Sequence, residues 1–383
     1  GQSMKDYRNY CLRILAIIID GLGWLLFFWL PRPKIEPSRI KKLLILKFDR
    51  LGDTFLSEPT IVALRRIFPQ AQLVVACSFW NRGVLVSNPA IDQIVCLPSL
   101  PDIHHSHWRD FLRLANIKRI GNLVKEQQPE VVIDLQGNPL NVLAMFKSGV
   151  KYRVGYGTKV ASFLLTEAAY YRGDWPQTKI YFSLTRLFNY SQPLTVPKIY
   201  AGQDDIKKVS SFIQANNCLP FIVFHLGAGR SYKQWPVQYF AAIANRLIIH
   251  YPQWKIVVVG GQEDQKLYDS FILSVDKPGK IISAIGEFDI PALYYFLGQA
   301  QLFIGNDSGP GHLAAAQGTP VISLMNPWSG IERWQARGPQ VSLFYKSAHH
   351  CRGIRCHLDP CPNMAAITID EVWAAVQQHL TLC

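Results

Sequence analysis

The sequence predicts an α/β protein with two Rossmann-like domains, each a parallel sheet with helices on both faces, and an N-terminal hydrophobic helix. The chain of 383 residues is long enough for two domains of ordinary size. Short apolar runs typical of buried strands alternate with helical segments, which is the pattern of a parallel sheet. The alternation starts again after a change of composition near Pro193 and Pro197. We therefore expect a hydrophobic helix over residues 4–33 and domains over 40–195 and 200–383.

The composition limits the classes of partner. Hydrophobic residues make up 49% of the chain and charged residues 17%, which argues against disorder. The net charge of +13 indicates an anionic partner, namely nucleic acid, an anionic membrane surface or a phosphorylated substrate. Nucleic acid is the least favoured of these, because the basic residues are spread out and no zinc-finger or RNA-binding signature occurs.

Residues 10–30 are strongly apolar, but they do not form a clean membrane-spanning segment. Arg13 and Asp20 interrupt the run, whereas a spanning helix needs about 20 consecutive apolar residues. The aromatic residues within 24–30 instead predict a helix lying in the membrane interface. Basic residues flank it on both sides: Lys5, Arg8, Arg32, Lys34, Arg39, Lys41 and Lys42. A helix packed on the protein's own core, or on a second copy, is the other interpretation.

The first domain begins with a buried strand over residues 42–48, and the polar loop Asp49–Thr54 follows it. A helix is expected from about Pro59 to Phe68. Further elements are expected as strands over 72–76, 93–97 and 131–134 and as a helix over 108–128. Ligands of parallel sheets bind beyond the carboxyl ends of the strands. The candidate binding residues in those loops are Arg50, Asp53, Gln136 and Asn138.

The second domain repeats the pattern. A strand over residues 220–225 leads into a glycine-rich loop, 226–230, and Lys233-Gln-Trp-Pro236 then leads into a helix ending near His250. Further elements are expected as strands over 255–259 and 281–283 and as helices over 291–299 and 368–380.

Residues 302–324 predict a strand, a tight turn, a short helix and a second strand. Asp307 and Ser308 are residue types that cap helices, and Pro310 suits a first helical turn. Gly318 is a typical helix stop. The N–H groups and the dipole of such a helix N-terminus favour an anion, typically phosphate. An ordinary strand-to-helix turn is the alternative.

Three loops of the second domain follow strand ends and should converge on one cleft. Small residues that let a phosphate approach the backbone, and cations next to them, occur together in the first loop: Gly227, Ala228, Gly229, Arg230 and Lys233. Glu263 follows another strand end, where an acidic residue often accepts from ribose hydroxyls. The helix N-terminus from Asp307 to His312 completes a predicted nucleotide diphosphate site without a Walker lysine motif.

Three ordered motifs, at residues 46–53, 227–236 and 306–320, resemble the bacterial lipopolysaccharide heptosyltransferases of glycosyltransferase family 9. The resemblance runs from about Lys41 to the C-terminus. It implies the GT-B fold, in which the sheets of two Rossmann-like domains face a central cleft, with the acceptor domain first and the ADP-sugar domain second. It also implies inverting, metal-independent transfer of a heptose or related sugar to a growing lipopolysaccharide core. Such a protein would be cytoplasmic and peripherally associated with the inner membrane.

The resemblance also assigns roles to residues of this chain. It makes Asp53 the catalytic base, Lys233 the phosphate-binding lysine and Glu263 the acidic partner of the ribose. Its phosphate-cradling loop corresponds to Asp307, Ser308, Gly309 and His312, and its acceptor domain makes Arg50, Gln136 and Asn138 candidate acceptor contacts. The chain departs from the family pattern at Asn141, where a basic residue is common, and at Gly311, where Met is commoner. The first departure concerns the identity of the acceptor.

The residues suit this chemistry without a cofactor. One base takes the proton of the acceptor hydroxyl, and positive charge stabilises the diphosphate as it leaves. No Asp-x-Asp metal motif occurs, and Asp204 and Asp205 precede a helix, where they are expected to cap it. The alternative role for Asp53 is as an N-cap of the helix that follows.

A cysteine cluster near the C-terminus is a candidate metal site. It consists of Cys351, Cys356 and Cys361, with His349, His350 and His357 among them. Their spacing is not that of paired Cys-x2-Cys zinc sites, although a related heptosyltransferase group has a cysteine-bound iron. Reduced thiols in a surface loop are the interpretation that we favour.

Other functions stay open at this point. The chain could transfer another nucleotide sugar, heptosylate a protein acceptor, act as a GT-B nucleotide-sugar epimerase, or bind a sugar nucleotide without catalysis. An epimerase would leave the lipid-side helix and Asp53 without a role.

Overall fold

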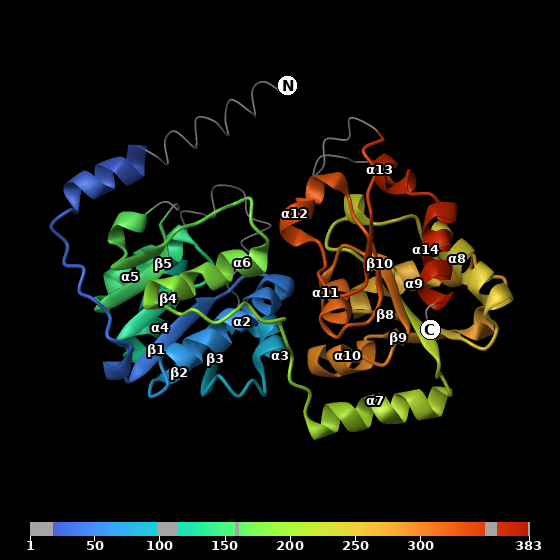
Figure 1. Cartoon of the computed structure of the whole chain (residues 1–383), viewed down its shortest axis with the longest axis horizontal. Helices are drawn as coiled ribbons and strands as arrows, with labels where there is room; N and C mark the ends of the chain where they lie inside the picture. The colour runs from blue at the N-terminus through green and yellow to red at the C-terminus, as the bar shows by residue number, and fades with distance from the viewer. Residues whose placement is uncertain (1–17, 98–113, 158–160, 349–357, 382–383) are drawn as a thin grey trace. The chain divides into compact units, whose positions relative to one another are not determined.

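The chain forms two compact units, residues 1–197 and residues 198–383 (Figure 1). The computed structural model describes residues 18–97, 114–157, 161–348 and 358–381. Among these residues, no helix has both the length and the apolar character needed to cross a membrane.

The first unit is built on a parallel sheet of six strands in the order β3-β2-β1-β4-β5-β6. Its strands are β1 (Lys42–Lys47), β2 (Gln72–Ser78), β3 (Gln93–Leu97), β4 (Val131–Asp134), β5 (Tyr152–Tyr156) and β6 (Glu167–Ala169). The central strands β1 and β4 are almost wholly apolar and buried, as expected for strands covered on both faces. The predicted strands of this unit are confirmed, and β5 and β6 extend the sheet.

The helices of the first unit connect these strands. They are α2 (Leu51–Ile67), α3 (Arg82–Leu85), α4 (Leu114–Gln127), α5 (Pro139–Ser148) and α6 (Gln177–Phe182), with 3-10 turns η1 (Pro37–Arg39), η2 (Phe79–Asn81), η4 (Ser162–Leu164) and η5 (Ser183–Phe188). A further helix over residues 18–26 precedes them. The part of the predicted helix over 108–128 that precedes Leu114 lies outside the described residues.

The prediction that the second helix begins near Pro59 is wrong. Helix α2 begins at Leu51, so Pro59 lies inside it and the predicted Asp49–Thr54 loop is mostly a first helical turn. Arg50 occupies the N-cap position, which excludes Asp53 as the cap. A carboxylate in a first turn, as at Asp53, is stabilised by the helix dipole. A proline is typical of a first helical turn, but a long and well-packed helix such as α2 tolerates one in its interior.

The second unit repeats the architecture, with strand order β12-β11-β10-β7-β8-β9. Its strands are β7 (Phe221–His225), β8 (Lys255–Gly260), β9 (Ile281–Ile285), β10 (Leu302–Asn306), β11 (Val321–Leu324) and β12 (Val341–Phe344). Its helices are α7 (Gln203–Asn216), α8 (Val237–His250), α9 (Gln265–Ile272), α10 (Ile290–Leu297), α11 (Gly309–Ala316), α12 (Ile331–Trp334), α13 (Pro362–Ala365) and α14 (Ile369–Thr381). Its 3-10 turns are η6 (Ser231–Lys233), η7 (Gln262–Asp264), η8 (Pro278–Lys280) and η9 (Pro327–Ser329).

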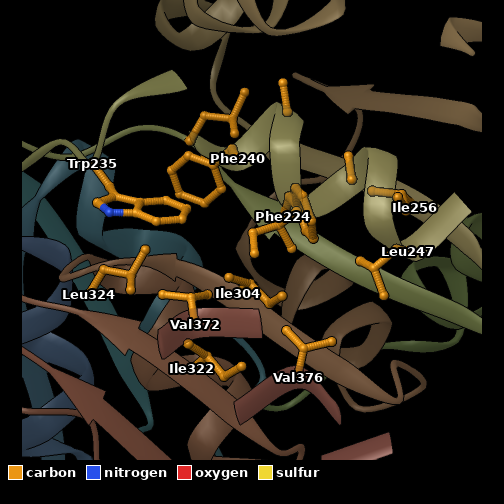
Figure 2. Packing of buried hydrophobic residues seen from close by; sticks show 14 of the residues in the cluster. Phe224, Trp235, Phe240, Leu247, Ile256, Ile304, Ile322, Leu324, Val372 and Val376 are labelled. Atoms are coloured by element: carbon orange, nitrogen blue, oxygen red, sulfur yellow. The ribbon is translucent and has the colours of Figure 1, made fainter. Parts of the chain in front are cut away.

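Successive side chains of β7 point to opposite faces of the sheet, so the core of the second unit has two layers. Phe224 packs against Phe240 of α8 and Phe271 of α9, on the face that α14 also covers (Figure 2). Phe221 points to the other face, where its ring stacks on Phe296 of α10 at 4.7 Å. The sheet is therefore buried on both sides, which leaves its carboxyl edge for polar side chains.

Two predicted caps can be compared with the structure. Asp205 accepts a hydrogen bond from the Gly202 N–H at 2.7 Å at the start of α7, so the capping role predicted there is confirmed. Ser308 occupies the N-cap position of α11, but its side chain makes no capping bond to the helix. Pro310 lies in the first turn, and Gly318 follows the helix with a φ of +83°, which is the left-handed stop expected of it.

Candidate active site

The loops expected to bind a nucleotide follow three neighbouring strands of the second sheet. β10, β7 and β8 run parallel in register, with Gly305 opposite His225 and His225 opposite Val259. The residues that follow these strands therefore meet at one edge of the sheet.

Asn306, the last residue of β10, connects two of the loops. Its side chain is buried and donates to the carbonyl oxygens of Leu226 at 2.8 Å and Gly227 at 3.3 Å. Its amide oxygen accepts from the Trp235 N–H at 2.9 Å. Trp235 is itself fully buried and donates from its indole to the Ile367 carbonyl at 2.9 Å. These bonds fix the glycine-rich loop and the Lys233 segment relative to the start of α11.

His225, the last residue of β7, positions Ser308. Its Nδ1 lies 2.9 Å from the Ser308 hydroxyl, which also donates to the Asn306 carbonyl. Its Nε2 lies 3.6 Å from the carboxylate of Asp264, which in turn accepts from the Gly261 N–H at 3.2 Å. The Ser308 hydroxyl is thus engaged by His225 of β7 and Asn306 of β10, and it makes no capping bond to α11. This end of α11 keeps the positive potential of a helix N-terminus.

Lys233 is the cation placed at this edge. Its Nζ lies 2.7 Å from the carboxylate of Asp307. The Asp307 side chain is buried, and the Lys233 side chain is mostly buried. A carboxylate repels a phosphate, so Asp307 suits holding the lysine at the start of α11 rather than contacting the anion itself. The structure thus brings two of the predicted residues together in one ion pair.

The small residues of the glycine-rich loop are not equivalent. A Cβ atom on Gly227 would collide with the Asp264 carboxylate, so this glycine is required by packing inside the protein. Gly229 is exposed, and a Cβ atom there would have no neighbour within 4 Å, so a ligand has room at Gly229. Ala228 between them is half-buried.

The other predicted donor-side residues occupy the same edge. Arg230 is half-buried at the N-cap of η6, and His312 is half-buried within the first turns of α11. Gly309 is the first residue of α11. Glu263 is exposed in η7 after β8, with its carboxylate over Gly261, so that a Cβ atom on this glycine would strike it. An exposed carboxylate beside a strand end is a suitable acceptor for sugar hydroxyls.

The first unit carries a buried charged network at the carboxyl end of β1. Lys47 is fully buried, and its Nζ lies 2.8 Å from the Asp49 carboxylate and 3.7 Å above the ring of Tyr181. The Tyr181 hydroxyl donates to Asp53 Oδ1 at 2.8 Å and lies 3.5 Å from Asp49 Oδ2. Burial, and then the charges of Asp53 and Asp49, raise the pKa of Tyr181 well above 10, so its hydroxyl keeps its proton. One oxygen of the Asp53 carboxylate is thereby held in place.

A second buried carboxylate lies at the end of β4. Asp134 accepts from the N–H groups of Gln136 at 3.1 Å and Asn138 at 2.8 Å and from the Asn141 side chain at 2.9 Å. Burial raises its pKa, although these hydrogen bonds oppose the rise. The Asn138 side chain caps α5 by accepting from the Leu140 N–H, so it serves the fold. Gln136 is half-exposed and, of these two predicted acceptor contacts, is the one better placed to meet a ligand.

Arg50, the third predicted acceptor contact, is half-buried at the N-cap position of α2. It lies three residues from Asp53, on the same helical turn. Its backbone carbonyl accepts from the N–H of Thr54 at 3.0 Å, which fixes the start of the turn that carries Asp53.

Asp49→Asn is expected to gain stability relative to the natural protein as the pH rises. Burial raises the pKa of Asp49 from 3.8 to about 7, with Lys47 opposing and Asp53 adding to the rise. Between these values the folded protein binds more protons than the unfolded chain, so its stability falls with rising pH by up to about 1.4 kcal/mol per unit. Asparagine does not titrate. The variant's free energy of unfolding relative to the natural protein should therefore rise by about 2 kcal/mol from about pH 5 to about pH 7 and then level off.

Urea unfolding of both proteins across this pH range measures the difference. Two stability curves that stay parallel would mean that Asp49 is ionised throughout and that its pKa is not raised.

The cysteine cluster is only partly described. Cys361 is buried and accepts a hydrogen bond from the Asn326 side chain at 3.4 Å. Cys351 and Cys356, with His349, His350 and His357, lie outside the described residues, and the metal alternative stays a prediction. Within the described ranges, no three His, Cys, Asp or Glu side chains are grouped to hold a metal ion.

Five residues of these networks had no role predicted from the sequence: Lys47, Asp49, Tyr181, His225 and Asn306. Each is polar and buried, and four of them lie at or next to the end of a strand predicted from the sequence. A charged or amide residue at the end of an apolar run was the available signal for those four. Tyr181 had no such signal, because it lies 128 residues from Asp53.

Comparison with known proteins gives the family. The model of glycosyltransferase family 9 (heptosyltransferase) matches residues 117–361. The lipopolysaccharide heptosyltransferase 2 of Salmonella typhimurium is 23% identical over 301 residues, which cover 75% of this chain and 83% of that protein.

Solved structures show the same fold. The Escherichia coli ADP-heptose lipopolysaccharide heptosyltransferase II covers 89% of this chain and 99% of its own, with a TM-score of 0.71 at 18% identity. A family 9 glycosyltransferase from Veillonella parvula covers 91% of this chain and 99% of its own, with a TM-score of 0.74 at 18% identity. These matches confirm the GT-B expectation for two Rossmann-like units. With the family model covering more than half of its length, the chain belongs to glycosyltransferase family 9, the heptosyltransferases, and is a glycosyltransferase.

Proposed function

We propose that this protein transfers a heptose, or a closely related sugar, from an ADP-sugar to a saccharide of a lipopolysaccharide core. The transfer inverts the anomeric centre, uses Asp53 as general base and requires no divalent metal. The donor and acceptor classes follow from the names of the relatives, which are heptosyltransferases of lipopolysaccharide, and one of which is named for ADP-heptose.

The arrangement of charge at the end of β10 carries the proposal. Lys233, held by Asp307, lies beside the N-terminus of α11, whose N-cap residue makes no side-chain capping bond. In the glycine-rich loop, a Cβ atom on Gly229 would have no neighbour within 4 Å, which leaves room for a ligand. A diphosphate placed there would meet one ammonium group and the positive end of a helix. This is the stabilisation that a leaving nucleoside diphosphate needs when no metal is bound. Glu263, exposed after β8, would accept from the ribose hydroxyls.

The chemistry at the acceptor requires one base. The acceptor hydroxyl forms a new bond to the anomeric carbon while the bond from that carbon to the β-phosphate oxygen breaks, and ADP leaves with the electron pair. Attack from the face opposite the leaving group inverts the configuration. The hydroxyl proton passes to Asp53, whose Oδ1 is held by Tyr181, so we assign the transfer to Oδ2. Gln136 and Arg50 are the proposed acceptor contacts.

The acceptor also determines where the protein works. A lipopolysaccharide core is built on a lipid, so this enzyme would meet its substrate at the cytoplasmic surface of the inner membrane. Peripheral association with that surface is therefore part of the proposal.

Measuring nucleotide release and sugar transfer across a panel of ADP-, UDP- and GDP-sugars tests this function. The expected result is a preference for ADP-sugars, above all ADP-heptose, with turnover that depends on a core acceptor and is unchanged by EDTA. A preference for a UDP-sugar would contradict the donor assignment. A strict need for added Mg²⁺ or Mn²⁺ would contradict the metal-free mechanism.

A further inference from the structure

The helix over residues 18–26 and the turn after it have two different faces. Asp20, Gly23, Phe27 and Leu30 face the first unit and are half-buried or buried. Their spacing of three and four residues is that of one side of a helix. Exposed large hydrophobic residues occupy the other side: Ile18, Ile19, Leu22, Trp24, Leu25, Leu26, Phe28 and Trp29. We call this second set the apolar face.

Specific contacts fix the first side to the protein. The Asp20 carboxylate accepts from the hydroxyl of Ser162 at 2.7 Å and from its N–H at 3.2 Å. The ring of Phe27 stacks on Phe163 at 5.4 Å and meets Phe146 of α5 edge-on at 6.2 Å. Gly23 packs so closely on Phe163 that a Cβ atom would collide with its ring. The helix lies on the side of the first unit that carries α5 (Figure 1), where Phe27 meets Phe146.

The exposure of the apolar face is large for side chains of this kind. Leu25 is 68% exposed and Phe28 is 73% exposed. Exposed hydrophobic residues elsewhere in the described ranges are spread over the surface of both units, whereas eight lie here within twelve residues. Concentrated apolar surface of this sort marks an interaction site.

Basic residues border the apolar face. Arg32 is exposed, and its guanidinium lies 4.1 Å from the ring centre of Trp24, a member of the face. Lys34 is exposed two residues further on. Residues 21–35 contain no aspartate or glutamate.

We propose that the apolar face is a docking surface for an anionic lipid bilayer, on which the helix lies in the plane of the interface. Trp and Phe side chains enter the boundary between headgroups and acyl chains, and the basic border meets anionic headgroups. A second copy of the chain fits less well, because two such borders would carry like charges against one another. The docking surface rests on the proposed function in that it assigns the peripheral association to named residues, but it can be tested apart from the transfer reaction, since binding to lipid requires neither donor nor acceptor.

Vesicle binding of the full chain tests the proposal. The probe is flotation with vesicles of phosphatidylglycerol and phosphatidylethanolamine that contain no glycolipid. The test variant is Leu25→Glu with Phe28→Glu. The matched control is Ile249→Glu with Leu273→Glu, which makes the same change of charge at side chains 66% and 87% exposed in the second unit.

The natural protein and the control are expected to float with the vesicles, and the test variant to bind about 100-fold more weakly because two apolar anchors are lost. Raising the salt from about 0.1 M to about 1 M should weaken binding without abolishing it, because only the basic border is screened. Arg32→Glu with Lys34→Glu should weaken it by about 30-fold or more, since each cation near an anionic surface contributes about fivefold. Unchanged melting temperatures would show that each variant is folded.

Equal binding by the test variant and the control would overturn the proposal, as would a natural protein that stays off the vesicles at low salt. Self-association without lipid, lost in the test variant and combined with no vesicle binding, would assign the apolar face to a second copy. None of these outcomes depends on sugar transfer, so failure here would leave the proposed reaction intact.

Discussion

Asp53→Asn is expected to lower kcat by about 100-fold or more while leaving the affinity for ADP unchanged, because the amide cannot accept the proton of the acceptor hydroxyl. The substitution keeps the size of the side chain and an oxygen for the Tyr181 hydroxyl, so the fold should be preserved. Single-turnover transfer kinetics and calorimetric titration with ADP measure the two quantities.

Two further variants make this test specific. Asp276→Asn makes the same chemical change at an exposed residue of the second unit. Asp276 lies in the loop that precedes β9, away from the carboxyl ends of the strands, so this variant should leave kcat unaltered. Tyr181→Phe removes the hydrogen bond that holds Asp53 Oδ1, and it should lower kcat by about tenfold with little change in KM, since about 1.5 kcal/mol of positioning is lost. An Asp53→Asn enzyme with most of its activity would remove this carboxylate from the role of base.

Lys233→Ala is the second change with a large expected effect. A charged hydrogen bond to phosphate contributes about 1.5–3 kcal/mol, so kcat/KM for the ADP-sugar should fall by about 10-fold to 100-fold. Part of the loss should appear in kcat, because negative charge grows on the diphosphate as the glycosidic bond breaks. Steady-state kinetics with varied donor separates kcat from KM.

The Asp307 partner provides the control for this prediction. Asp307→Asn leaves the lysine in place but removes the ion pair of 2.7 Å that orients it, so a smaller loss is expected. In the double variant the two effects should not add, since Asp307 is proposed to act through Lys233. Additive losses would mean that Asp307 contacts the substrate independently. A Lys233→Ala enzyme with unchanged donor kinetics would contradict the phosphate site.

Much of the fold could be predicted because buried parallel strands are continuous apolar runs bounded by polar residues. The strand over Val131–Asp134 and the glycine stop at Gly318 were found in this way. The start of α2 was missed because proline is a stronger local signal than the packing that keeps Pro59 inside a helix. Local patterns carry no information about such tertiary compensation.

The sequence predicts those parts of the candidate site that are short motifs. It does not predict the contacts between residues that are far apart in the chain. Lys233 and Asp307 were found separately, but their ion pair joins residues 74 positions apart. The bond from Tyr181 to Asp53 and the pair of His225 and Ser308 likewise depend on which strands become neighbours. For the N-terminal segment, the sequence allowed either a helix in the membrane interface or a helix packed on the protein or on a second copy. The structure shows that one side packs on the protein, and that the other side is exposed.

The most direct test of the central claim is mass spectrometry of a heptose-acceptor core oligosaccharide after incubation with ADP-heptose. The natural enzyme should add one heptose to the acceptor, with or without EDTA, and the Asp53→Asn enzyme should add almost none over the same time. An acceptor that gains no sugar from ADP-heptose, incubated with folded enzyme that binds ADP, would contradict the account.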